Sequence, residues 1–255
     1  IQNNKIQITF TYKPELVQLV KSLSGREYDP KSRNWSIPIA GSLSAVKRLA
    51  DNGFFISQDV IQAVKEDKRL ADEAESLALL DDVKFDGGDL PLYPFQKVCS
   101  AFMVKTGSCL NACGVGTGKT LMSLSATVVN KTKKNLIIAP KSLLLQWQSE
   151  INRWLPSYKT FVVSGNKTQR EEIYSKAKEC LDFHFLIMSY EQARIDALVA
   201  NYQTIVIDEA HRAGNTRTKT YKALRKICEG SEYRYLLSAT PMMNRPIELY
   251  GILNL

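Results

Sequence analysis

The stretch LNACGVGTGKTLMSLSATVV, residues 110–129, decides the fold. It opens with a short apolar run at 110–112, passes through three glycines in five residues and continues as a helix-length segment at 121–129. A strand, glycine loop and helix in this order gather backbone N–H groups and the positive end of a helix dipole around one anion. We therefore predict a phosphate-binding loop. It is made by Gly114, Val115, Gly116, Thr117, Gly118, Lys119 and Thr120.

Two side chains of this loop suit the chemistry of a nucleoside triphosphate. Lys119 would reach the β and γ phosphates of ATP, and the Thr120 hydroxyl would ligate Mg²⁺. The loop departs from the usual pattern at Cys113, where the first glycine normally stands, with Gly114 one place further on. A glycine-rich turn by itself is often only a turn, so the inference needs a second motif.

That second motif is TIVIDEAH, residues 204–211, which predicts a buried strand that ends in two carboxylates and a histidine. Asp208 at the strand tip would hold the Mg²⁺ shell, and Glu209 would orient and deprotonate the water that attacks the γ-phosphate. His211 would sense the γ-phosphate or link to Ser238 and Thr240 on the next strand. An Asp-Glu pair after a strand is often only a helix start, but its occurrence together with the glycine loop favours catalysis.

Apolar, strand-length runs alternate with helix-length segments in the rest of this part of the chain. The runs lie at 110–112, 135–139, 160–163, 183–188, 204–207 and 234–237. Such a pattern is typical of a parallel sheet with helices on both faces, so the predicted fold class is α/β. Ligands of these sheets bind at the carboxyl ends of the strands. We expect Lys119 and Asp208 to lie a few ångströms apart, at neighbouring strand tips, around one Mg-triphosphate.

The first 57 residues predict a separate, small α+β domain. An alternating segment at 5–12, a helix from Pro14, a hairpin around 28–39 and a second helix indicate a βαββαβ-like unit, closed by a short strand at 54–56.

Between the small domain and the sheet, residues 58–91 predict an acidic helical linker. The helix would run to residue 80, and the glycine pair at 87–88 indicates a flexible joint. Residues 92–255 then form the parallel-sheet lobe.

Charge is distributed unevenly along the chain. Residues 1–57 carry +4, residues 58–92 carry −6 and residues 93–255 carry +10, which gives the formal net charge of +8. Basic bodies attract polyanions through counterion release, so nucleic acid is a reasonable partner of both, although solvated lysine faces explain such charge equally well.

The composition also restricts the cellular setting. No apolar run approaches the ~20 residues of a membrane-spanning helix, and the N-terminus lacks a secretion signal. The five cysteines contain no CxxC pair and are odd in number, which argues against a disulfide framework or a zinc site. We expect a protein of a reducing, intracellular compartment, cytoplasmic in a bacterium or phage and nuclear in a eukaryote, without a membrane partner.

With both motifs in place, the lobe resembles the helicase and translocase superfamily that carries DEAD/DEAH boxes, in its SWI/SNF-type branch. The resemblance rests on LYPFQ (92–96), LIIAPKSL (136–143), IMSYEQ (187–192), DEAH (208–211) and LLSATPMMN (236–244). It implies a RecA-like, P-loop fold and ATP with Mg²⁺ as cofactors. In LYPFQ it implies that the Gln96 amide pairs with the adenine and that Tyr93 packs beside it.

The small domain resembles the HARP domain of annealing helicases, through YDPKSRNW at residues 28–35. RPIELY (245–250) also resembles that subgroup, whose members use ATP to move on duplex DNA and to remodel forks. An ordinary hairpin with a core tryptophan remains the alternative. From the residues themselves, Lys31 and Arg33 on an exposed turn would meet phosphates, and Trp35 would stack on an exposed base or lie in the core.

In the lobe, the resemblance places contacts with the DNA backbone at Pro140, Lys141, Ser142, Ser189 and Tyr190. Small hydroxyls, loop N–H groups and a lysine at helix starts suit phosphates without reading base edges. Helix capping is an equally good explanation for the Ser142 and Ser189 side chains. The predicted partner is duplex or forked DNA, bound without sequence preference.

The resemblance also implies a second RecA-like lobe, which closes over the nucleotide and supplies arginine fingers. Because an arginine finger contributes ~10³ to 10⁵ in rate, we expect this chain alone to bind ATP but to hydrolyse it feebly. The missing lobe would come from a further part of the protein or from a partner.

Two other functions stay open from the sequence. One is another motor of the same superfamily, an RNA helicase or a restriction-type translocase. The other is a non-hydrolysing DNA-binding module gated by nucleotide, which would not need the water-activating carboxylate of Glu209.

Overall fold

The computed structural model describes residues 1–2, 5–30, 32–78, 84–196, 202–242 and 245–255. The chain divides into two compact units, Ile1–Ser76 and Leu77–Leu255, and each is described here by itself. Within the described residues, no helix has both the length and the apolar content needed to cross a membrane.

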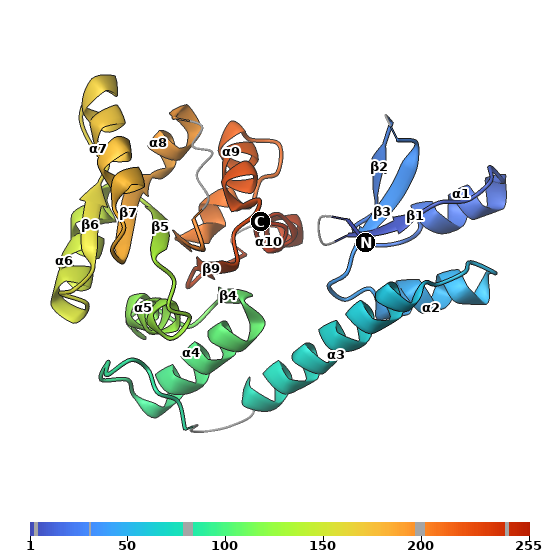
Figure 1. Cartoon of the computed structure of the whole chain (residues 1–255), viewed down its shortest axis with the longest axis horizontal. Helices are drawn as coiled ribbons and strands as arrows, with labels where there is room; N and C mark the ends of the chain where they lie inside the picture. Colours follow the sequence, from blue (N-terminus) through green and yellow to red (C-terminus); the bar gives the residue numbers. More distant parts are fainter. Residues whose placement is uncertain (3–4, 31, 79–83, 197–201, 243–244) are drawn as a thin grey trace. The chain divides into compact units, whose positions relative to one another are not determined.

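The first unit is built on a small antiparallel sheet. Its described strands are β1 (Lys5–Ile8), β2 (Glu27–Asp29) and β3 (Asn34–Pro38), in the order β1-β3-β2, and β2 and β3 form the expected hairpin with Tyr28 opposite Trp35. Helices α1 (Pro14–Lys21), α2 (Leu43–Asp51) and α3 (Gln58–Ala78) share one hydrophobic core with this sheet (Figure 1). Pro14 begins α1 because the first helical position needs no N–H donor.

The predicted strand at 54–56 is wrong, since this segment is irregular in the structure. Its alternation instead serves packing, because the Phe54 ring meets the Phe10 ring edge-on at 5.6 Å and Ile56 contacts the same core, while Phe55 is 91% exposed. The segment leads into α3, which adds Val60 and Val64 to this core. The hydrophobic core of the first unit therefore includes side chains of α3.

The second unit contains a parallel sheet, as predicted. In the described residues, six strands form it: β4 (Ser108–Asn111), β5 (Lys134–Ala139), β6 (Lys159–Val162), β7 (His184–Ser189), β8 (Thr204–Asp208) and β9 (Tyr233–Leu237). Each predicted apolar run corresponds to one of these strands within two residues at either end. β5, β7 and β8 are buried on both faces, which explains why their sequences are continuously apolar.

Helices cover both faces of this sheet (Figure 1). One core joins a strand face to α4 (Pro94–Thr106), α5 (Lys119–Val129) and α6 (Leu144–Trp154). The other core joins the opposite face to α7 (Lys167–Glu179), α8 (Tyr190–Ile195), α9 (Lys219–Cys228) and α10 (Pro246–Leu253). Two short 3₁₀ segments, η1 (Lys141–Leu143) and η2 (Ala210–Ala213), follow β5 and β8.

The strand order, β4-β9-β8-β5-β7-β6, corrects one prediction. The strand before the glycine loop, β4, and the strand before the DEAH box, β8, are not neighbours, because β9 lies between them and pairs with both. The carboxyl ends of β4, β9 and β8 still share one edge, so the loop after β4 must extend across the end of β9 to approach Asp208.

The glycine pair at 87–88 lies against α5. The Gly87 carbonyl accepts a hydrogen bond from the Ser125 hydroxyl at 2.9 Å. A Cβ on Gly88 would come within 2.4 Å of the Val128 side chain. These two glycines allow the backbone to approach a buried helix closely.

Candidate functional site

The glycine loop joins the edge strand β4 to the N-terminus of α5. Gly116 and Gly118 have φ of 76° and 81°, in the left-handed region that glycine tolerates best. The Lys119 ammonium lies back over the loop and donates to the carbonyls of Cys113 and Gly114, at 2.9 and 2.8 Å. The loop therefore surrounds a lysine that contacts its backbone, at the start of a helix.

Gln96 ties α4 to this loop. Its side-chain oxygen accepts from the Tyr93 N–H at 2.9 Å, and its amide nitrogen donates to the Thr117 carbonyl at 2.9 Å. The side chain is buried and both of its ends have partners inside the protein, so its predicted pairing with adenine stays a prediction. Tyr93 is 68% exposed and stacks on Phe95 with ring centroids 6.2 Å apart, which leaves an aromatic surface beside the loop.

Asp208 ends β8 with both of its carboxylate oxygens bonded. Oδ2 accepts from the indole N–H of Trp147 at 2.9 Å, and Oδ1 accepts from the N–H of Glu209 at 2.9 Å. Burial raises the pKa of the Asp208 carboxyl, while the Trp147 and Glu209 hydrogen bonds and the positive charge of Lys119 act to lower it.

Glu209 has a left-handed backbone, with φ 52° and ψ 50°. This conformation costs a residue with a Cβ roughly 1–2 kcal/mol. The Tyr190 hydroxyl donates to the carbonyl of Asp208 at 2.6 Å and contacts the carbonyl of Glu209 at 3.1 Å, so it supports the backbone at this point.

His211 lies between the ends of β8 and β9. Its Nδ1 is 3.2 Å from the Ser238 hydroxyl and 3.2 Å from a Glu209 carboxylate oxygen. The Ser238 hydroxyl also accepts from the N–H of Thr240 at 3.3 Å. Of the two roles predicted for His211, this is the geometry of the link to Ser238 and Thr240.

The residues predicted to hold Mg²⁺ offer a suitable, though small, donor set. Thr120 and Asp208 contribute only hard oxygen atoms, and the described part of the chain contains no cluster of three or more His, Cys, Asp or Glu side chains suited to a metal. Mg²⁺ usually keeps several waters and is bound by one or two protein oxygens together with phosphates. The donor set fits that ion and does not fit a zinc cage.

The residues predicted to contact DNA follow β5 and β7, which are neighbours, so their loops share one edge of the sheet. Lys141 and Ser142 are exposed, and Ser142 makes no capping hydrogen bond. Ser189 does cap α8, because its hydroxyl accepts from the N–H of Gln192 at 3.2 Å. The Tyr190 side chain is 4% exposed and is directed to the DEAH box.

In the first unit, the predicted DNA-contacting residues lie on and beside the hairpin. Arg33 is exposed with φ 55°, while Lys31 is outside the described residues. The Trp35 ring is half-buried against Tyr28, with centroids 4.9 Å apart. Trp35 therefore contributes to the core and keeps one part of its surface exposed.

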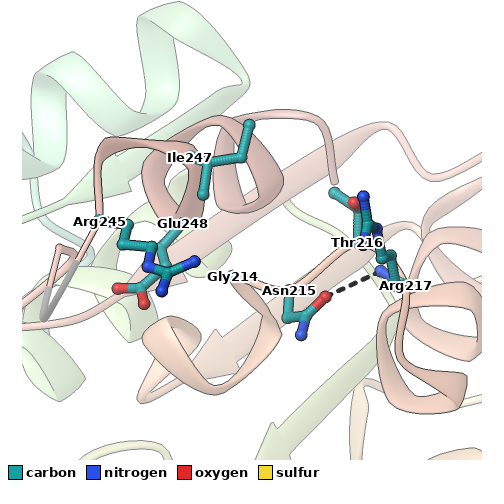
Figure 2. A pocket seen from close by; sticks show the side chains of 7 residues that line it. All are labelled: Gly214, Asn215, Thr216, Arg217, Arg245, Ile247 and Glu248. Carbon is teal, nitrogen blue, oxygen red and sulfur yellow. Dashed lines mark hydrogen bonds between the residues drawn. The ribbon is translucent and has the colours of Figure 1, made fainter.

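A pocket of about 630 Å³ lies beyond the DEAH box, between η2 and the start of α10 (Figure 2). Figure 2 shows Arg245 and Glu248 on one side and Asn215 with Arg217 on the other, where the Asn215 side chain accepts from the Arg217 N–H at 3.0 Å. None of the residues predicted to bind ATP lines it. It is therefore separate from the glycine loop.

Sequence reasoning missed two contacts that hold the site. The sequence gives no role to Trp147, and it predicts Tyr190 only as a DNA contact. Buried indole N–H and phenol O–H groups need hydrogen-bond acceptors. A tryptophan and a tyrosine near the start of helices that follow strand ends could therefore have indicated contacts with polar groups at those strand ends.

A glycine loop and a carboxylate pair at one edge of this sheet define a RecA-like α/β lobe. The chain belongs to the SNF2-related domain family, whose match covers residues 47–255. Residues 6–42 match the HepA-related protein (HARP) family. Both resemblances seen in the sequence are confirmed.

Known relatives share this region. The SWI/SNF-related matrix-associated actin-dependent regulator of chromatin subfamily A-like protein 1 of Xenopus laevis is 29% identical over 98% of this chain and 26% of its own length. The ISWI chromatin-remodeling complex ATPase ISW1 of Saccharomyces cerevisiae is 36% identical over 55% of this chain and 13% of its own length. The chain thus spans about a quarter or less of these relatives.

A solved structure has a similar fold. The Sulfolobus solfataricus SWI2/SNF2 ATPase core in complex with dsDNA aligns with 69% of this chain and 37% of its own, with a TM-score of 0.56 and 25% identity.

Replacing Trp147 with Phe tests whether its indole anchors Asp208. We expect W147F to lower the free energy of unfolding by about 1–3 kcal/mol, because the half-buried Asp208 carboxylate, whose pKa is already raised by burial, loses the donor that the buried Trp147 provides. W154F on the same helix is the matched control. It removes a donor from the half-buried Glu150, bonded at 2.8 Å, and should cost less than about 1 kcal/mol.

Denaturant unfolding of both variants measures this difference. The difference in unfolding free energy between the two variants should narrow as the pH falls. The Trp147 hydrogen bond lowers the pKa of Asp208, so it stabilises the ionised carboxylate, and this stabilisation is lost once Asp208 is protonated. Equal losses of stability in W147F and W154F at all pH values would contradict the assignment.

Proposed function

We propose that this chain is the ATP-binding part of a motor that moves on duplex DNA, of the annealing-helicase type. ATP with Mg²⁺ is the proposed cofactor. The observation that supports the proposal is that the Lys119 loop, after β4, and the Asp208-Glu209 pair, at the end of β8, lie at the same edge of the parallel sheet.

The proposed chemistry uses the residues at that edge. Lys119 would exchange the carbonyls of Cys113 and Gly114 for the β and γ phosphates, since an ammonium gains more from an anion than from neutral acceptors. Thr120 and Asp208 would hold Mg²⁺, which neutralises charge on the phosphates. Glu209, set at an angle to β8 by its left-handed backbone, would orient the attacking water and accept its proton.

His211 and Ser238 would couple nucleotide binding at this site to the segment after β9, which carries Thr240. Their 3.2 Å contact supports this proposal, because it joins the DEAH box to the segment that follows β9.

DNA is the proposed polymeric partner. The loop after β5 presents the exposed Lys141 and Ser142 at the edge that β5 shares with β7, and a lysine and a small hydroxyl there suit a phosphate backbone. The alignment with an SWI2/SNF2 ATPase core in complex with dsDNA supports duplex DNA. In the first unit, the exposed Arg33 and the Tyr28-Trp35 pair would add a phosphate contact and a stacking surface.

A second RecA-like lobe is the other proposed partner. The region shared with this chain makes up 26% of the Xenopus laevis relative and 13% of ISW1, and hydrolysis of this type needs an arginine finger. The chromatin-related names of the relatives support a nuclear location if the source is eukaryotic.

The nucleotide proposal is tested by binding of a fluorescent ATP analogue with and without Mg²⁺. K119A should weaken binding by about tenfold or more, because the charge-assisted contacts to the phosphates are lost. The charge-matched control K222A, at an exposed site on α9, should bind as the unchanged chain does.

In the complete protein, E209Q should keep ATP affinity within about twofold and lower DNA-stimulated hydrolysis by about 10² or more. A non-hydrolysing module would show the same nucleotide response in E209Q as in the parent protein, and that result would sink the motor proposal.

The DNA proposal is tested by titrating duplex DNA at several salt concentrations. K141A should weaken binding and reduce the slope of log K against log salt by about 0.9, the loss of one phosphate contact, whereas K222A should leave the slope unchanged. Preference for double-stranded RNA over duplex DNA in the same titration would support the RNA helicase alternative instead.

A further inference from the structure

Two cysteines meet beside the phosphate loop. The sulfur of Cys99, on α4, lies 3.6 Å from the sulfur of Cys113, the residue that stands where the loop pattern has its first glycine. Both side chains are half-buried and both are free thiols. The two segments they join are already linked by Gln96, whose amide donates to Thr117 in the same loop.

A cavity of about 220 Å³ gives access to this pair. It is lined by Cys99 and Cys113 together with apolar side chains of α4 and β4, and by a third thiol, Cys109. The volume is several times that of a small oxidant such as hydrogen peroxide, given that a water molecule occupies about 30 Å³ of liquid.

We propose that Cys99 and Cys113 are an oxidation site, at which a peroxide forms a disulfide that fixes the phosphate loop and weakens ATP binding. The effect on ATP rests on the nucleotide site proposed above, whereas the formation of the disulfide does not.

The reaction is a two-electron oxidation of the two thiols by one peroxide. One thiolate attacks a peroxide oxygen, the O–O bond breaks, and the sulfur becomes a sulfenic acid while hydroxide leaves and takes up a proton. The second sulfur then attacks the sulfenic sulfur, the S–S bond forms and water leaves. Two thiols and one hydrogen peroxide thus give one disulfide and two waters.

The geometry requires a movement that the fold can supply. The sulfurs must approach from 3.6 Å to the bond length of about 2.05 Å. A change of side-chain rotamer with a small shift of the loop covers this gap, because Cys113 follows the last residue of β4 by two positions and precedes the exposed turn at Val115, which is 89% exposed.

The consequence for the loop follows from the contacts of Cys113. Its carbonyl and that of Gly114 hold the Lys119 ammonium at 2.9 and 2.8 Å. A disulfide at Cys113 restrains the backbone that carries those carbonyls. Lys119 would then be kept on the loop and away from the phosphates, so triphosphate binding would have to work against the crosslink.

Two of the thiols that line the cavity, Cys99 and Cys109, favour the protonated form. Burial, together with the neighbouring Cys113, raises the pKa of Cys99 to about 11, and burial raises the pKa of Cys109 to about 12. The thiolate is the reactive form, so oxidation should accelerate as the pH rises.

The test exposes the full chain to hydrogen peroxide and measures intact mass and ATP affinity. We expect a loss of about 2 Da, for the two hydrogens removed, and a fall in ATP affinity of about tenfold or more. Dithiothreitol should reverse both changes. C99A should bind ATP like the parent chain when reduced and should keep that affinity after peroxide.

Peptide mapping does not distinguish a Cys99–Cys113 disulfide from a Cys99–Cys109 disulfide, because Cys109 and Cys113 lie on one tryptic peptide, residues 106–119. The variant C109A distinguishes them. C109A should still lose about 2 Da and should still lose ATP affinity. C180A, at an unrelated cysteine, should behave like the parent.

Absence of the mass loss, loss of the crosslink in C109A, or a disulfide that leaves ATP affinity unchanged would each overturn the proposal. If the reduced chain fails to bind ATP, the proposed function is refuted. Formation of the Cys99–Cys113 disulfide can still be tested in that case by the mass loss and by C109A.

Discussion

Strand β8 is buried along its length until its last residue, Asp208, where the chain must place a carboxylate at the boundary of a hydrophobic core. Desolvation disfavours the charged form of such a group, and the raised pKa of Asp208 is its result. The indole of Trp147 and the N–H of Glu209 offset part of that cost by binding one oxygen each. A buried carboxylate can remain available for a cation only when its geometry is fixed in this way.

The same constraint explains how the helices around the site are arranged. Trp147 comes from α6, which follows the loop after β5, and Tyr190 begins α8, which follows β7. Both side chains reach back to the end of β8, one to the Asp208 carboxylate and the other to the backbone of the Asp-Glu pair. Movement of either helix would therefore displace a hydrogen-bond donor of the carboxylate site. Each of the two loops predicted to contact DNA thus leads directly into a helix that contacts the DEAH box.

Much of this arrangement could be predicted from local sequence. The strands of the lobe were found because a strand buried on both faces leaves a continuous apolar run, and the glycine loop was found because few other structures need three glycines in five residues. Strand order could not be found in this way. The insertion of β9 between β4 and β8 depends on which helix crosses which face, and no local pattern records it.

Long-range contacts were missed for the same reason. Trp147 and Asp208 are 61 residues apart in the chain, and no local pattern pairs them. The segment at 54–56 shows the opposite error, in which an alternating pattern was assigned to a strand. Phe54 and Ile56 pack into the core there, but the segment pairs with none of the described strands, so alternation produced burial without a strand.

Gln96 illustrates why the loop and α4 should be regarded as one element. Its capping box closes the start of α4, and its amide nitrogen holds the Thr117 carbonyl. A Cβ at Gly118 would lie 2.4 Å from that nitrogen, so a side chain there would displace the Gln96 amide as well as strain the backbone at φ 81°. Because the segment that carries Tyr93 is thereby bonded to the segment that carries Lys119, a base bound at one and phosphates bound at the other would be positioned by the same rigid unit. A change in either segment must then be transmitted to the other.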